Sequence, residues 1–471
     1  MTRVFPVLLV VLLGVGAAIA IRAQFAKIPA TPARVPDGDA EVAYIHTTTN
    51  PQTWERFVAG VLQAGRQVPG LEVDDSRAFL DQPAAVPEVV VSRKGRPGKL
   101  RFRWYKLSSE VGNREWVAAL AARQPPPIAF MGGGTSDRAI ELAVALNERE
   151  AWAGGPRPLL VVTTATANLV EPEPGRKVGL LSLYPGRTFR GCFTNEAMAE
   201  AVVDFVGSAD EFRPTARPDV AAHVIAWQDD PYSVDLADEF VERLRERKDR
   251  TVRTVLDRVP YSVGTFTEPN PVEREVMDRI VPDIPTGDGD RTLLVLPAVT
   301  QPARRILRAF AADSPLIGKH LVAITGDGVS FNTTYRDSDV AWPVRELSIP
   351  LVFFAHQNPV AWDRMDDQAG VPLPLRSSTD DVLLFADEVR VVAEAVFGPG
   401  GAKDADELAA RLRAREPAFF TPAGERRPGA GEHVVVVRPQ FLPDGRVHRE
   451  AVFDVYGRRA GTWERVQRLV K

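Results

Sequence analysis

Residues 128–137 read IAFMGGGTSD, and they decide the fold. A short apolar run leads into a glycine turn with hydroxyl side chains, and apolar residues then recur at helical spacing. This order predicts a buried strand of the parallel type, a tight turn and an amphipathic helix. In α/β folds, turns of this kind at the carboxyl ends of parallel strands form the ligand site.

The same unit recurs along the chain. Residues 158–167 read PLLVVTTATA, with threonines directly after an apolar run. Residues 224–232 read VIAWQDDPY, where an acidic turn and a tyrosine open the next helix. Strands that alternate with helices predict the α/β class with parallel sheets. Residues 100–105, LRFRWY, alternate apolar and basic side chains, which predicts an edge or half-exposed strand.

The glycine turn has three readings. Thr135 and Ser136 can contact a small ligand while backbone N–H groups face its anionic group, or they can simply cap the helix. A nucleotide phosphate is the third reading and the weakest, because neither Gly-x-Gly-x-x-Gly nor a P-loop lysine is present. The first reading is favoured. The threonines of residues 163–168 are likewise read as a ligand contact, with solvent-exposed coil as the alternative.

Charged residues near the turns also leave alternatives open. Arg190 is expected to pair with a neighbouring carboxylate, and anion binding is its second reading. Asp229 and Asp230 are expected to cap a helix rather than to serve as an acid–base pair. The common hydrolase motifs are absent from the sequence, so an enzyme is disfavoured.

Composition narrows the class of protein further. The 471 residues carry a net charge of −4, which gives no global attraction to nucleic acid. Cys192 is the single cysteine, so no intramolecular disulfide forms, and the six histidines show no zinc spacing. We expect no cofactor and no metal.

The N-terminus predicts export. Residues 1–23 join a short basic start to a long apolar run, as in a cleaved signal peptide or a retained membrane anchor, and the two outcomes stay open. Residues 24–40 are Pro-rich and polar, which predicts a linker. The expected location is periplasmic or otherwise extracytoplasmic.

The ordered set of turns resembles the type I periplasmic binding proteins, most closely the leucine-binding-protein-like receptors of branched-chain amino acid ABC transporters. The resemblance covers almost everything from Glu41 onward. It includes the turn Gly326-Asp327-Gly328 and a terminal hairpin whose Asp-Gly turn separates strands at residues 434–437 and 452–456.

This resemblance implies two Rossmann-like lobes with parallel sheets, joined by three crossovers, with a ligand cleft between them. In the family the two hydroxyl-rich turns hold an α-carboxylate, an aromatic ring covers the ligand and an acid receives an ammonium group. The matching positions here are Thr135, Ser136, Thr164 and Thr166 for the carboxylate, Tyr232 for the ring and Asp327 for the acid.

The expected lobes are assembled from four segments. Residues 41–190 and 326–400 are assigned to the first lobe, and residues 191–325 and 401–471 to the second. The expected function is capture of a small polar solute, an amino acid or related carboxylate, for the membrane subunits of an ABC transporter. The alternatives are a membrane-anchored sensor with the same fold and, less favoured, an α/β enzyme.

Overall fold

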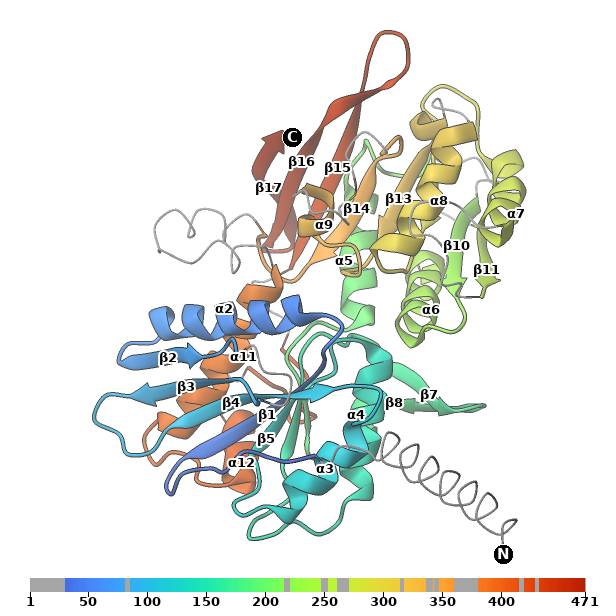
Figure 1. Ribbon diagram of the computed structural model, residues 1–471. Coiled ribbons are helices and arrows are strands. Elements are labelled where there is room, and N and C mark those ends of the chain that lie inside the picture. Colours follow the sequence, from blue (N-terminus) through green and yellow to red (C-terminus); the bar gives the residue numbers. More distant parts are fainter. Residues whose placement is uncertain are drawn as a thin grey trace, which may run out of the picture.

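The computed structural model describes residues 30–80, 85–215, 221–246, 253–260, 271–313, 317–335, 342, 347–359, 380–414, 419–427 and 432–470. They form two α/β lobes, one above the other in Figure 1, each built on its own sheet. The predicted class, two lobes with largely parallel sheets, is confirmed.

The first lobe has a seven-stranded sheet in the order β2-β3-β4-β1-β5-β6-β9. Its strands are β1 (Ala40–Thr47), β2 (Leu71–Arg77), β3 (Glu88–Arg93), β4 (Leu100–Leu107), β5 (Ala129–Gly132), β6 (Leu159–Val162) and β9 (Thr188–Arg190). Its helices are α2 (Pro51–Gln67), α3 (Asn113–Ala122), α4 (Ser136–Glu148), α11 (Asp380–Phe397) and α12 (Ala405–Ala414), and a small hairpin pairs β7 (Leu169–Glu173) with β8 (Arg176–Gly179). The strands from β4 to β9 are parallel, so their carboxyl ends meet at one edge.

The second lobe has an eight-stranded sheet in the order β11-β10-β12-β13-β14-β15-β16-β17. Its strands are β10 (Ala221–Trp227), β11 (Arg253–Val259), β12 (Thr292–Val295), β13 (Leu321–Thr325), β14 (Leu351–Ala355), β15 (His433–Phe441), β16 (Val447–Arg459) and β17 (Thr462–Val470). Its helices are α5 (Asn195–Ser208), α6 (Pro231–Glu246), α7 (Pro271–Ile280), α8 (Thr300–Asp313) and α9 (Phe331–Tyr335). The first five strands of this order are parallel and the last three are antiparallel, as expected of the terminal hairpin.

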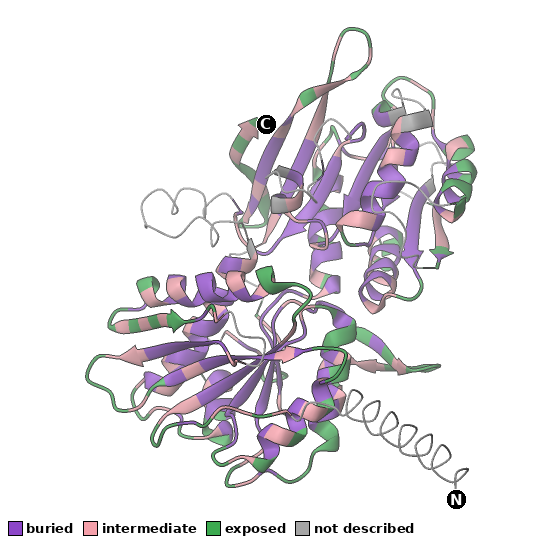
Figure 2. Cartoon of the chain, viewed as in Figure 1, coloured by how far each residue is buried: buried purple, intermediate pink, exposed green. Residues whose placement is uncertain are grey.

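The strands form because their apolar runs are covered on both faces. Every residue of β5 and β6 is buried, and the central strands of both sheets are purple along their length in Figure 2. Such two-sided burial is what a continuous apolar run needs in place of an alternating one. Helices with one apolar face complete each layer: Trp54, Phe57 and Val58 of α2, for example, are fully buried against the first sheet.

The chain passes between the lobes three times, at places that we call crossings. The first crossing, residues 191–194, joins β9 to α5, the second lies between β14 and α11, and the third precedes β15. The sequence analysis placed the first boundary at residue 190. The other two lie later in the chain than the expected boundaries at 325 and 400, because β14 extends the second sheet and α12 packs in the core of the first lobe.

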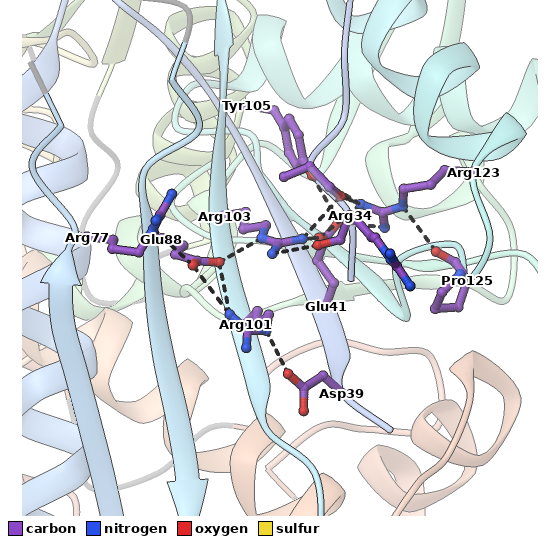
Figure 3. Close-up of polar contacts among 11 residues, drawn as sticks. Arg34, Asp39, Glu41, Arg77, Glu88, Arg101, Arg103, Tyr105, Arg123 and Pro125 are labelled. Carbon is purple, nitrogen blue, oxygen red and sulfur yellow. Dashed lines mark hydrogen bonds and ion pairs between the residues drawn. The ribbon is translucent and has the colours of Figure 1, made fainter. Parts of the chain in front are cut away.

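Strand β4 is a correction to the sequence analysis. Its alternating arginines predicted an edge or half-exposed strand, yet β4 lies between β3 and β1 and is mostly buried. The physical reason is a set of buried carboxylates (Figure 3). Arg103 donates to Glu41 on β1 at 2.6 Å and to Glu88 on β3 at 2.9 Å, so its charge is neutralised inside the lobe.

The same network holds the end of the predicted linker. Arg103 donates to the carbonyl oxygens of Ala33 and Arg34 at 3.2 and 3.0 Å, and Arg123 donates to that of Ala33 at 2.7 Å. Val35 is buried beside them. The predicted signal peptide or anchor, residues 1–23, lies outside the described residues. Within the part of the chain that the structure describes, no helix has both the length and the apolar character needed to cross a membrane.

Candidate functional site

The glycine turn after β5 lies between two other strand ends of the first lobe. A Cβ added at Gly134 would lie 3.6 Å from the ring of His46, near the carboxyl end of β1, and 3.8 Å from Oγ1 of Thr164, which follows β6. Thr164 donates its hydroxyl to the carbonyl oxygen of Gly134 at 3.0 Å. The two hydroxyl-rich turns that the sequence singled out are therefore in contact, and Thr164 positions the glycine turn.

Helix α4 starts at this turn with an unused hydroxyl. Thr135 is its exposed N-cap residue and makes no side-chain capping bond. Ser136, the first helical residue, is only 2% exposed, and its Oγ has no hydrogen-bond partner among the residues that the structure describes. Buried hydroxyls are nearly always paired, and the N-terminus of a helix attracts anions. The N-terminus of α4 is therefore suited to binding a carboxylate.

His46 beside this turn was missed by the sequence analysis. Its Nε2 is buried without a partner. Burial, followed by the charges of Arg56 and Arg138, lowers the pKa of His46 to about 4, so the ring is neutral at neutral pH. A small cavity of about 20 Å³ next to the ring, lined also by Asn113 and Gly133, has room for one water molecule. A polar residue at the carboxyl end of a buried strand was the signal available for His46.

Thr166 lies deeper than the other predicted site residues. It is fully buried and donates its hydroxyl to Oδ1 of Asn195 at 2.7 Å. Arg190 holds the same turn through the carbonyl oxygens of Thr166 and Ala167 and Oδ1 of Asn168. The hydrogen bonds of Arg190 thus go to this turn instead of to the carboxylate that the sequence analysis expected. This arrangement makes Thr166 a positioning residue of the turn.

The second lobe brings Tyr232 and Asp327 together. Oη of Tyr232 accepts a hydrogen bond from the backbone N–H of Gly328 at 3.0 Å. Burial, followed by the charge of Asp327, raises the pKa of Tyr232, so its hydroxyl stays protonated. Oδ2 of Asp327 lies 2.7 Å from Nε2 of His356, which follows β14 and is 2% exposed. His356 is a second residue that the sequence analysis missed.

Asp230 has the expected capping role and a further property. Its Oδ1 accepts the backbone N–H of Tyr232 at 3.1 Å, which confirms the predicted helix cap. Burial raises the pKa of Asp230 to about 6, and the charge of Asp137 at the start of α4 adds to this effect. Asp137 belongs to the first lobe, so the starts of α4 and α6 lie close enough to interact electrostatically.

A chain of hydrogen bonds connects the two sets of predicted residues. Asn195, at the start of α5, receives the hydroxyl of Thr166 and donates to the carbonyl oxygen of Tyr232 at 3.2 Å. Asp235 of α6 accepts the backbone N–H groups of Asn168 and Leu169 at 2.7 and 2.9 Å. These contacts join the lobes beside the first crossing. The turns of both lobes therefore lie next to one another, as a ligand site between lobes requires.

Comparison with known proteins identifies the fold. The chain matches no protein-family model and no curated protein. Among solved structures it is similar to an ABC transporter solute-binding protein of R. palustris in complex with 4-hydroxybenzoate, with a TM-score of 0.53 and 13% identity over 92% of this chain and 97% of that one. It is also similar to a type 1 periplasmic binding protein of Bordetella pertussis, with a TM-score of 0.52 and 11% identity over 88% and 99% of the two chains.

A third structure, a putative branched-chain amino acid ABC transporter protein of Silicibacter pomeroyi, has a TM-score of 0.50 and 14% identity over 83% of this chain and 86% of that one. At these identities the likeness concerns the fold, and it agrees with the two sheets and three crossings described above. The chain has the fold of the type I periplasmic binding proteins.

Proposed function

We propose that this protein is an extracytoplasmic solute-binding protein that captures a small carboxylate between its lobes and delivers it to the membrane subunits of an ABC transporter. The observation that carries the proposal is Ser136: a buried hydroxyl without a partner at the N-terminus of a 13-residue helix, facing no other described acceptor or donor. A bound carboxylate would satisfy this hydroxyl together with the free N–H groups of the first helical turn. The solute-binding proteins with this fold give the proposal its context.

The second lobe bears on the class of carboxylate. Asp327 would receive the ammonium group of an amino acid, as the family resemblance implies, and Tyr232 beside it would contact the ligand. One oxygen of Asp327 already interacts with His356. A carboxylate without an amine, such as the 4-hydroxybenzoate of the R. palustris protein, is therefore the competing ligand class.

The first experiment identifies the solute by mass spectrometry of ligand that co-purifies with the protein. Calorimetric titration then compares wild type with Ser136→Ala, and with Ser182→Ala as a control at an exposed serine of the same lobe. Loss of a hydrogen bond to a charged group costs about 1.5–3 kcal/mol, or about ten- to a hundredfold in affinity. Equal affinity of the two variants would refute a carboxylate site at α4.

A second titration separates the ligand classes. Leucine and isocaproate share a carbon skeleton, and only leucine carries an ammonium group. If Asp327 receives that group, Asp327→Asn weakens leucine binding and leaves isocaproate binding nearly unchanged. Equal losses for both would assign Asp327 to the structure of its turn. Binding of 4-hydroxybenzoate and not of leucine would transfer the proposal to the amine-free class.

One observation favours a sensor as the second candidate. The carbonyl groups of Ala33 and Arg34 are held by the buried Arg103, so the chain that precedes the first lobe leaves it at a fixed point. A retained membrane anchor ahead of this point would tether the first lobe to the membrane, as a signalling role requires. Sequencing the N-terminus of the protein from membrane and soluble fractions decides between them: a cleaved, soluble product supports the transporter role.

A further inference from the structure

Glu388 of α11 is a buried acid that neither the fold nor the proposed ligand site explains. The residue is 1% exposed, and neither oxygen of its carboxyl group has a hydrogen-bond partner in the described part of the chain. A buried carboxylate without a partner is costly, so such a group takes up a proton instead. Burial accordingly raises the pKa of Glu388 well above its ordinary value, against the opposing effect of Arg426.

The carboxyl group lies against the first crossing between the lobes. A Cβ at residue 191 would overlap Oε1 of Glu388, so the side chain packs directly on the backbone of Gly191. Arg426, on the segment that leads to the third crossing, donates to the carbonyl oxygen of Gly191 at 3.0 Å and stacks on the ring of Phe193 at 5.0 Å. Glu388 is therefore packed where two of the three crossings meet.

The surroundings of Glu388 cannot stabilise a second charge state in this arrangement. The groups that face it are Tyr44 on β1, Cys192 on the first crossing, Asp381 and Asp387 on its own helix, and Arg426 on the third segment. Arg426 is the cation among them, and it is already engaged by Asp387 at 3.4 Å. An ionised Glu388 would add a third carboxylate to this group and would have no water to solvate it.

We propose that Glu388 is a proton-operated switch of the hinge: its protonated carboxyl lets the first crossing pack as in this structure, and loss of the proton drives the crossing away and opens the lobes. The physical link is the contact with Gly191. An ionised carboxylate of Glu388 must be solvated by water or form a direct ion pair with Arg426. Either change requires Gly191 to move. Because Gly191 starts the crossing, its displacement rotates one lobe against the other. Acid pH favours the closed arrangement and alkaline pH the open one.

The test measures the distance between the lobes directly, without a ligand. Spin labels are attached at Arg149→Cys in the first lobe and Arg245→Cys in the second, both exposed positions, while the native Cys192 is buried and stays unlabelled. Pulsed electron–electron double resonance then measures the mean distance between the two labels at pH values from about 5 to about 9. Glu388→Gln keeps the shape of the side chain and cannot ionise, and Glu407→Gln on α12 is the control at an exposed glutamate.

We expect the distance to lengthen with pH in the wild type and in Glu407→Gln, and to stay short in Glu388→Gln. An equal shift in all three proteins, or no shift in the wild type, would overturn the switch. Infrared spectroscopy gives an independent check. The wild type should show the carbonyl band of a protonated carboxyl group at neutral pH that Glu388→Gln lacks, and a wild type without this band would also overturn the proposal.

The switch rests on the lobe motion of the proposed function, and the two fail differently. Adding the identified solute to the labelled wild type at one pH tests closure on a ligand. A distance that responds to solute but not to pH refutes the switch alone. A distance that responds to pH but not to solute supports the switch and counts against capture by lobe closure.

Discussion

Glu41 and Glu388 are both buried in the first lobe, and their surroundings are opposite. Glu41 is fully enclosed and accepts hydrogen bonds from Arg103 at 2.6 Å, from Arg123 at 2.8 and 3.0 Å and from the hydroxyl of Tyr105 at 3.2 Å (Figure 3). Glu388 is equally buried and accepts none.

This difference distinguishes a buried acid that stabilises the fold from one that does not. Burial alone would lower the pKa of Arg103, but Glu41 and Glu88 outweigh burial and raise it, so the arginine stays charged inside the lobe. Removing one partner of such a pair leaves the other as an uncompensated buried charge. Removing a carboxyl group that has no partner leaves no such charge behind. Stability does not account for Glu388, and that leaves room for a role in motion.

The largest effect is expected from Glu41→Gln. The substitution keeps the shape and removes the charge that faces Arg103 and Arg123, so the buried Arg103 is left with Glu88 and the partly buried Arg123 loses its ion pair with Glu41. We expect a loss of about 3–5 kcal/mol in the free energy of unfolding. Urea denaturation followed by tryptophan fluorescence measures it. A loss below about 1 kcal/mol, as at an ordinary surface position, would show that the ion pairs of Glu41 do not stabilise the fold and would refute its contrast with Glu388.

Gly191→Ala should have an intermediate effect. The backbone at this position is accessible to any residue, and only space is lacking, because the new methyl group would overlap the carboxyl group of Glu388. Overpacking of this kind costs about 1–3 kcal/mol. Adding Glu388→Ala should restore most of the loss, since the two residues are in direct contact. Additive losses in the double variant would show that the two side chains do not compete for one space.

The smallest effect is expected from Glu388→Gln, which is the matched counterpart of Glu41→Gln. At acid pH, where both side chains are neutral, its cost should stay within about 1 kcal/mol, because no ion pair is broken. The pKa of Glu388 is raised in the folded state, so the stability that Glu388 contributes is fully present below its ordinary pKa of 4.5 and is lost as pH rises through the raised value. Denaturation at several pH values should show a flatter profile for the variant. Parallel profiles would contradict the raised pKa.

The sequence predicted the parts of the fold that depend on local pattern. Continuous apolar runs identified β5 and β6, and the Asp-Gly turn identified the β15–β16 hairpin. The placement of β4 was wrong because its arginines read as exposed, and only the fold shows that Glu41 and Glu88 lie on the neighbouring strands. The second crossing was placed too early because a turn after β13 gives no sign that one more strand follows in the same sheet.

The sequence predicted which residues belong to the candidate site better than it predicted the contacts between them. Parallel strands bring their ends together, so turns distant in sequence were expected to meet, and Thr164 does contact the glycine turn. The contact of Asp327 with His356 and the lack of any partner for Glu388 depend on packing between distant segments. No periodicity or motif encodes such relations. The ligand contacts of the six predicted residues stay predictions.

The bonds between Asp235 and the backbone of Asn168 and Leu169 have a mechanical consequence. They are short, their acceptor Asp235 is buried and they lie close to the first crossing, so we expect a rotation of the lobes to preserve them. A rotation that preserves them takes its axis through this point. The displacement of an element then grows with its distance from this axis. Helices far from α6 move the most, and the β7–β8 hairpin moves very little. A solute would enter from the side of the molecule opposite this fulcrum.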